Sequence, residues 1–222
     1  MIETLLPNVR WDRLWQATVE TLFMTSISVV ATAVLGILLG LLLFLTARGN
    51  MWENRIAFTI TAAYVNIFRS IPFIILIILL IPLTKILVGT MLGAKAALPA
   101  LILGSAPFYA RMVEIALREV DKGVVEAAQA MGASNGTIIW KVLLPEAKPA
   151  LISGITVTAI ALVSYTAMAG VVGAGGLGDL AYIEGFQRTN NDVTLVATIM
   201  ILIIVFIIQW IGDYFTRMTD KR

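Results

Sequence analysis

Charge-free stretches are the main pattern along this chain, and they predict membrane-spanning helices. Three of them run for 20 residues or longer without Asp, Glu, Lys or Arg: 21–47, 149–178 and 193–212. A helix needs about 20 mostly apolar residues to cross a bilayer, so each of these can span alone. Two shorter stretches join across Arg69 into a fourth apolar segment, 56–84.

A last candidate span depends on pairing between charged residues. Its charge-free part, 96–110, is too short to cross a bilayer. Arg111, Glu114 and Arg118 follow three and four positions apart, so they can pair along one face of a continuing helix. We therefore predict an all-α integral membrane protein, a single domain over 1–222, with five transmembrane helices near 21–47, 56–84, 96–118, 147–168 and 193–213.

The positive charges predict the orientation of these spans. With the N-terminus outside, the inner side carries ten basic residues: Arg48, Arg55, Arg111, Arg118, Lys122, Lys141, Lys148, Arg217, Lys221 and Arg222. The outer side then carries five: Arg10, Arg13, Lys85, Lys95 and Arg188. Lys and Arg accumulate on the cytoplasmic side of membrane proteins, so the N-terminus is expected outside and the C-terminus inside.

The first span is expected to remain in the mature protein. The Ala-Thr-Ala sequence at 31–33 has the form of a signal-peptide cleavage site. However, the charge-free run around it is far longer than the about 7–15 residues of a signal peptide.

The composition excludes several classes of protein. Hydrophobic residues make up 59% of the chain and charged residues only 14%, with a mean hydropathy of +0.91. A soluble domain is about a quarter charged. The chain contains neither Cys nor His, so the usual zinc, haem and Ser–His catalytic sites are excluded. We expect no catalytic residues, no metal site and, at a net charge of only +2, no nucleic-acid partner.

The longest connection between spans, 119–146, lies on the cytoplasmic side in this topology. An apolar stripe at helical spacing predicts a short amphipathic helix there: Val124, Ala127, Ala128 and Met131. Gly132 is expected to end this helix and Ser134 to cap a second one. Leu144 precedes a proline and is expected to leave the helical region, so that Pro145 begins the next span.

Seven residues of this loop stand at the offsets of a known motif. They read Glu126-Ala127-Ala128-x3-Gly132-x9-Val142-x-Leu144-Pro145. This pattern resembles the EAA motif of bacterial ABC-importer permeases, which has isoleucine at the position of Val142. In that family the segment is a coupling helix that inserts into a cleft of a cytoplasmic ATPase. The resemblance implies a type I importer permease with these docking residues: Glu126, Ala127, Ala128, Gly132, Ala133, Ser134, Ile138, Val142, Leu144 and Pro145.

Four other segments indicate which importer permeases the chain resembles most. Residues 66–73, 106–111, 141–147 and 165–170 are similar to methionine ABC transporter permeases. The resemblance implies a homodimer in the bacterial inner membrane that imports D- and L-methionine. Its partners would be two ATPase chains, a periplasmic or lipid-anchored methionine-binding protein, and membrane lipid. The chain has no G-x4-G-K-[ST] sequence, so ATP and Mg would be bound by the ATPase, and we expect no cofactor in this chain.

The glycine-rich segment 170–178 contains G-x-G-x-x-G at 173–178. A dinucleotide site would need a strand before these glycines. Because a long apolar run precedes them, we expect instead a helix break or close packing that lines the translocation path near the outer face. A flexible outer loop is the alternative.

The end of the fourth span is a candidate outer gate. Met168 combines a flexible thioether with small neighbours such as Gly170, and Tyr165 lies one turn earlier. In a two-fold dimer, residues near the axis meet their own copies. We expect Met168 and its symmetry mate to close the path toward the periplasm. Ordinary helix packing is the alternative.

Arg69 is the one charge deep within a predicted span. A charge at mid-bilayer costs about 2.5–3.5 kcal/mol on insertion scales, so Arg69 is expected to face the protein interior, a cavity or an interface on the translocation path. Bracing of a helix broken at Pro72 is the favoured role. Contact with a substrate carboxylate is the alternative.

Three other functions are alternatives to a methionine permease. The same machine could carry another small solute, such as a quaternary amine or a phosphonate. A secondary transporter or channel is disfavoured by the docking loop and by the lack of an intramembrane acid or His relay. A membrane enzyme is disfavoured because no nucleophile–base pair is present.

Overall fold

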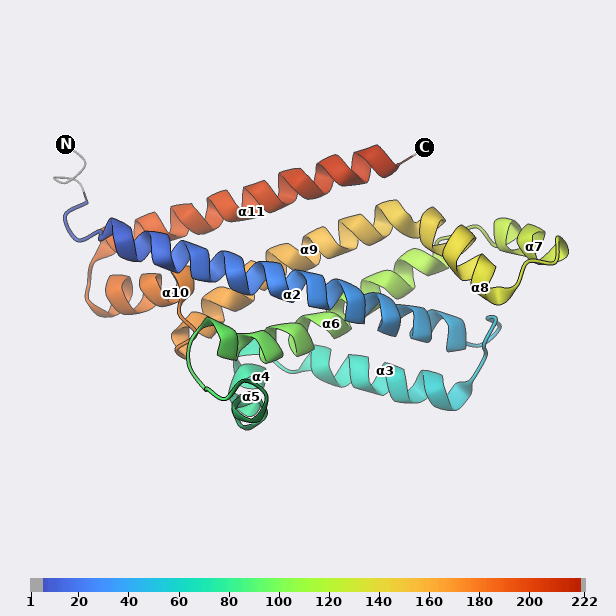
Figure 1. The fold of residues 1–222 in the computed structure, drawn as a ribbon, viewed down its shortest axis with the longest axis horizontal. Helices are drawn as coiled ribbons and strands as arrows, with labels where there is room; N and C mark the ends of the chain where they lie inside the picture. Colours follow the sequence, from blue (N-terminus) through green and yellow to red (C-terminus); the bar gives the residue numbers. More distant parts are fainter. Residues whose placement is uncertain (1–5, 221–222) are drawn as a thin grey trace.

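The computed structural model describes residues 6–220, which form an elongated bundle of helices without any strand (Figure 1). In chain order the elements are α2 (Trp11–Thr46), α3 (Arg55–Ser70), α4 (Phe73–Leu79), α5 (Ile81–Val88), α6 (Ala94–Arg118), α7 (Lys122–Ala130), α8 (Asn135–Ile138), the π-helical turn η1 (Ile139–Leu143), α9 (Leu144–Val171), α10 (Gly176–Asp179), the π-helical turn η2 (Leu180–Gln187) and α11 (Asn191–Thr219). The predicted all-α class is confirmed. Lys221 and Arg222, which were counted on the inner side, lie outside the described residues.

Four continuous helical segments of the described chain are long and apolar enough to cross a bilayer. They are α2, α6, the run Asn135–Val171, and α11. The bent pair of α3 and α4 provides a fifth crossing when it is counted as one span. The helices extend beyond the charge-free stretches, since α2 already begins at Trp11 and α11 ends at Thr219.

The span predicted over 56–84 is sharply broken rather than straight. α3 and α4 meet at an angle of 107°. Ile71 is extended, with φ −83° and ψ 123°, because a following proline disfavours helical geometry. Pro72 also lacks the N–H needed to continue the helix. α4 therefore turns away from the axis of α3 (Figure 1) and buries Phe73, which is only 7% exposed.

The prediction that Leu144 leaves the helical region is wrong. Leu144 has φ −67° and ψ −43°, and the second loop helix runs without interruption into α9. The Leu144 N–H bonds to the carbonyl of Ile139, five residues back, in the wider π-helical turn. That extra residue relieves the clash between a proline ring and the carbonyl four residues earlier, so Pro145 is accommodated without a break.

Small residues let α2 pack closely along α6. A Cβ on Gly36 would lie 2.5 Å from the Tyr109 ring, and one on Gly40 would lie 2.7 Å from the Ala110 carbonyl oxygen. Close approach of this kind is how helices associate where surrounding lipid removes the hydrophobic driving force. α2 and α6 therefore pack closely against each other in the bundle (Figure 1).

The charge pairing predicted along α6 is confirmed. Glu114 is only 1% exposed, and its carboxylate accepts hydrogen bonds from both Arg111 and Arg118, the latter at 2.6 Å. Arg111 also reaches the Asn66 side-chain oxygen on α3 at 3.4 Å. These bonds let a helix with three charges continue through the end of its span.

Candidate coupling and translocation sites

The loop helices are shaped by one glycine and two side-chain caps. Asp121 accepts a hydrogen bond of 2.7 Å from the Gly123 N–H at the start of α7, and Ser134 accepts one of 3.3 Å from the Thr137 N–H at the start of α8. Between them Gly132 has φ +77°, a left-handed conformation that glycine adopts without strain. The turn at Gly132 and the cap at Ser134 were both predicted and are confirmed as geometry. Docking remains the role proposed for them.

The apolar stripe of α7 does not form a buried face. Of its four members only Ala128 is buried, whereas Val124 is 44% and Met131 81% exposed. Trp140 on η1 is 71% exposed. Hydrophobic side chains gathered on a surface mark interaction sites. The spacing of the stripe predicts an amphipathic helix but not the direction of its apolar face, and Trp140 was not among the predicted docking residues. The position of Trp140 could have indicated an interaction site, because a tryptophan in a cytoplasmic loop has no core to fill.

The ten predicted docking residues therefore separate into two groups. Glu126, Ala127, Gly132, Ser134 and Pro145 are exposed. Ala128 and Ile138 are buried in a hydrophobic cluster that also contains residues of α2, α6 and α9, and this packing holds the loop on the bundle. Ala133, Val142 and Leu144 lie between these extremes. The motif thus supplies both an outward surface and the anchor that holds it.

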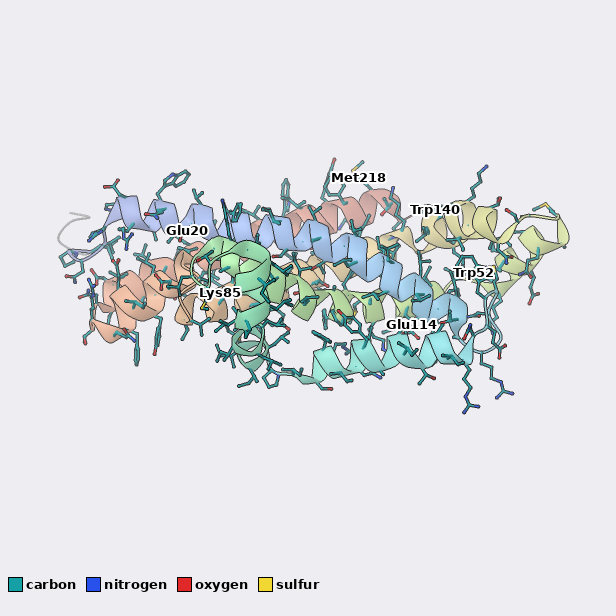
Figure 2. The ribbon with its side chains drawn as sticks, turned by 60° about the horizontal axis from the view of Figure 1, so that its bottom comes forward. Glu20, Trp52, Lys85, Glu114, Trp140 and Met218 are labelled. Carbon is teal, nitrogen blue, oxygen red and sulfur yellow. The ribbon has the colours of Figure 1, made fainter. Side chains whose placement is uncertain are left out.

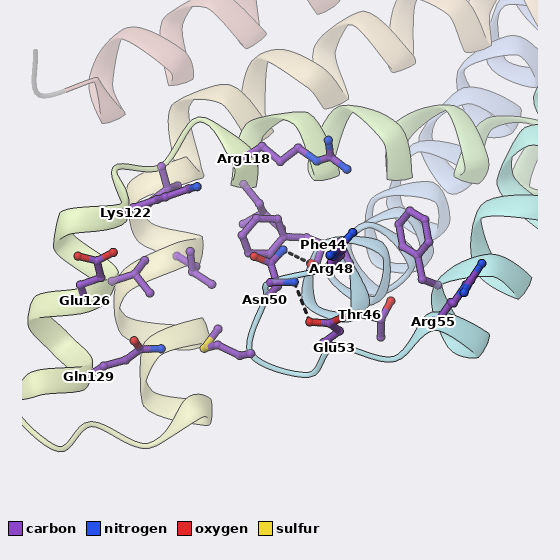
Figure 3. A pocket seen from close by; sticks show the side chains of 18 residues that line it. Phe44, Thr46, Arg48, Asn50, Glu53, Arg55, Arg118, Lys122, Glu126 and Gln129 are labelled. Atoms are coloured by element: carbon purple, nitrogen blue, oxygen red, sulfur yellow. Dashed lines mark hydrogen bonds between the residues drawn. The ribbon is translucent and has the colours of Figure 1, made fainter.

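A cleft of about 1370 Å³ lies behind α7, which no sequence pattern predicted. Figure 3 shows Lys122, Glu126 and Gln129 of α7 across from the α2–α3 turn. That turn is closed by a 2.9 Å hydrogen bond from the Gly49 N–H to the Glu53 carboxylate. The basic residues that line the cleft are Arg48, Arg55, Arg118 and Lys122. They outnumber the acidic residues of its lining, so the cleft carries net positive charge.

At the opposite end, glycines bring α9 and α10 into backbone contact. A Cβ on Gly170 would lie 2.3 Å from the Asp179 nitrogen, and one on Gly178 would lie 2.3 Å from the Ala167 Cα. The close packing expected for this segment is therefore present. A helix, α9, precedes the G-x-G-x-x-G sequence, so the strand required by a dinucleotide site is missing at that place.

Side chains of α2 hold the start of α10. The Glu20 carboxylate accepts a 2.8 Å hydrogen bond from the Gly176 N–H, and the Thr21 hydroxyl accepts one of 2.9 Å from the Leu177 N–H. Figure 2 places Glu20 toward one end of the molecule and Trp140 toward the other. Local sequence could not indicate these bonds, because they join residues 156 positions apart.

Acidic groups gather at this outer end. The Asp179 carboxyl is partly buried, and its burial together with the nearby negative charge of Glu20 raises its pKa. Arg13 opposes this shift and pairs with Glu184 at 3.4 Å. Together these contacts join the start of α2 to α10 and η2 as one unit.

The predicted gate residues are placed differently from one another. Met168 is 44% exposed in the protomer, which leaves it available to a second copy. Gly170 is buried against α10. Tyr165 stacks on Phe73 with ring centroids 4.5 Å apart. The structure brings Tyr165 together with Arg69 on one small cavity, but Met168 and Gly170 do not line it.

The bracing expected from Arg69 is absent from the described part of the chain. Its guanidinium is exposed in the protomer, and no hydrogen bond or ion pair joins it to any residue within 6–220. Ser70 instead bonds back to the Asn66 carbonyl at 2.8 Å and satisfies one acceptor near the break. At this helix end the Ser70 hydroxyl therefore bonds to the backbone, whereas Arg69 lines a small cavity.

Comparison with known proteins gives a consistent result. The model of the family described as binding-protein-dependent transport system inner membrane component matches residues 33–221. The chain is 66% identical to the methionine import system permease protein MetP of Bacillus subtilis, over all of both chains. It is 50% identical over 151 residues to the D-methionine transport system permease protein MetI of Escherichia coli, covering 68% of this chain and 70% of the relative.

Solved structures agree with these relatives. An inward-facing conformation of the MetNI methionine ABC transporter contains a chain that matches with a TM-score of 0.92 at 44% identity. The match covers 96% of this chain and 100% of that one. An amino acid ABC transporter with histidines matches with a TM-score of 0.70 at 18% identity, which indicates a shared fold.

Proposed function

This chain belongs to the family of binding-protein-dependent transport system inner membrane components, and we propose that it is the permease subunit of a methionine importer. Methionine is proposed as the substrate because the chain is 66% identical to a methionine import permease along its whole length. Relatives named for D-methionine transport support uptake of both isomers. The chain is a multi-pass inner-membrane protein, with apolar helices of the required length.

The energy is proposed to come from separate ATPase chains. The chain lacks a P-loop sequence of its own. Its loop presents Val124, Met131 and Trp140 to solvent at the cytoplasmic end, as a docking surface requires. A permease with one such loop fits a homodimer bound to two ATPases. ATP-driven closure of the ATPases would draw the two loops together and switch the path from inward-open to outward-open, where a binding protein delivers methionine.

Orientation can be tested with single cysteines, because the chain has none of its own. Gln187→Cys lies at the exposed end of η2, and Asn135→Cys lies at the exposed start of α8. With the N-terminus outside, an impermeant maleimide should label position 187 in intact cells and position 135 only after permeabilisation. Labelling of position 135 in intact cells would reverse the topology.

Met168 is proposed to meet its symmetry mate at the outer gate. If it does, Met168→Cys should cross-link the two permease chains on oxidation without nucleotide. Trapping an ATP-bound state should lower the yield, because the gate then opens. An active transporter that gives no cross-link in either state would place the gate elsewhere.

The cargo is tested by growth. A methionine auxotroph without its own high-affinity uptake should grow on D-methionine when it expresses this chain with its ATPase and binding protein. Growth that depends instead on uptake of a quaternary amine or phosphonate would assign another cargo. The chain should also co-purify with an ATPase, and isolation of an active transporter without one would favour a secondary transporter.

A further inference from the structure

A small aromatic cavity lies where α3, α4, α6 and α9 meet, away from the docking loop. Its volume is about 240 Å³, and its wall includes Phe68, Arg69, Phe73, Gly104, Phe108 and Tyr165. Pockets for drug-sized ligands are larger, about 300–1,000 Å³. The cavity therefore suits a molecule the size of one amino acid.

One charged group faces this cavity. Arg69 is the single charged residue among those that line it, and no described residue neutralises it. At the helical rise of 1.5 Å per residue, Arg69 lies about 21 Å along α3 from Arg55, well inside the span. Ionisable groups at such depth usually belong to substrate or ion pathways. A guanidinium binds a carboxylate with two parallel hydrogen bonds, so the missing partner is an anion.

Most of the other lining side chains are aromatic or aliphatic. Phe73 and Tyr165 stack with ring planes only 5° apart, and Phe68 and Phe108 also line the cavity. Sulfur of a thioether makes favourable contacts with aromatic rings. Gly104 leaves the space open, because a Cβ there would lie 3.1 Å from a Leu76 methyl and 3.4 Å from the Phe73 ring.

The position of the cavity fits a step in transport. Tyr165 is three residues, or about 4.5 Å along α9, on the cytoplasmic side of Met168. The cavity therefore lies close to the level of the proposed gate at Met168, on its cytoplasmic side. We propose that the cavity is a transient binding site for an amino acid with an unbranched apolar side chain, in which Arg69 binds the carboxylate and the aromatic rings hold the thioether. This inference rests on the proposed function as a methionine permease.

The test compares Arg69→Gln, Arg69→Lys and the control Arg217→Gln in the transporter reconstituted with its ATPase and binding protein. Arg217 is exposed in the last turn of α11, far from the cavity in sequence. Uptake of labelled methionine should fall at least about tenfold in Arg69→Gln, because charge-assisted hydrogen bonds to the cargo are lost. Arg69→Lys should retain part of the uptake, and Arg217→Gln should match the unmodified protein. Hydrolysis stimulated by the binding protein should persist in all three.

Several outcomes would overturn the assignment. Uptake by Arg69→Gln within about twofold of the unmodified protein would show that no carboxylate depends on Arg69. If Arg69→Gln fails to assemble, Phe108→Leu keeps the cavity apolar and should lower methionine uptake severalfold; unchanged uptake would contradict the aromatic contact. An unmodified transporter that moves no methionine would instead refute the proposed function.

Discussion

Gly178→Ala is expected to disrupt the outer end of the protein. The added Cβ would lie 2.3 Å from the Ala167 Cα and 2.4 Å from its carbonyl oxygen, so no rotamer change can relieve the clash. Overpacking of this kind costs about 1–3 kcal/mol, and a contact between two backbones belongs at the upper end. A cost of about 3 kcal/mol lowers the melting temperature of a protein of this length by about 6–12 °C. Thermal unfolding of the purified transporter measures the shift.

The matched control for this substitution is Gly136→Ala. Gly136 also lies in a helix, but a Cβ there would meet nothing within 4 Å. The control should melt within about 2 °C of the unmodified protein, because surface substitutions are usually within about ±0.5 kcal/mol. Equal melting of the two variants would contradict the backbone contact between α9 and α10.

Gly132→Val is expected to uncouple the permease from its ATPase while leaving it in the membrane. A Cβ at this position has open space around it, so the substitution acts through the backbone alone. A β-branched residue at φ +77° is strained by about 1–3 kcal/mol, which favours a turn of another shape. The second loop helix would then leave the first at a different angle. Hydrolysis stimulated by the binding protein should fall about tenfold or more, since a misplaced docking surface loses most of its affinity.

Two further variants separate strain from bulk. Asn tolerates the left-handed conformation, so Gly132→Asn should retain most of the coupled hydrolysis. Gly136→Val adds the same side chain on α8 without a positive φ and should also remain coupled. Normal coupling in Gly132→Val would remove the turn from the coupling mechanism.

Much of the fold follows from signals that act within a few residues. Charge-free stretches locate the apolar helices because a bilayer penalises each charge separately. The turn at Gly132 and the cap at Ser134 need only one residue and its near neighbours. The pairing of Glu114 with two arginines follows from helical spacing alone.

The features that were not predicted depend on contacts between residues far apart in the sequence, or on the angle at which one helix leaves another. Pro72 indicates a break but cannot give its angle, which is set by how α4 packs on α6 and α9. The contact between Glu20 and Gly176 joins opposite parts of the chain. The prediction that Leu144 leaves the helix failed because a single π-helical turn accommodates Pro145. The rule that the residue before proline avoids helical geometry does not include such a turn.

The candidate sites show the same division. The docking motif was visible because its residues are close in sequence. The cavity at Arg69 was not, because four separate helices supply its wall. Sequence identified Arg69 as unusual, but only the structure places Phe73, Phe108 and Tyr165 around the same space.

ATP-driven import of methionine is tested most directly by uptake into proteoliposomes that contain the permease and its ATPase. Labelled methionine and the binding protein are supplied on the outer face, and ATP is enclosed. Methionine should accumulate against its gradient with ATP, and accumulation should stop when a non-hydrolysable analogue replaces the ATP. Equal accumulation without ATP, or ATP hydrolysis without methionine uptake, would contradict it.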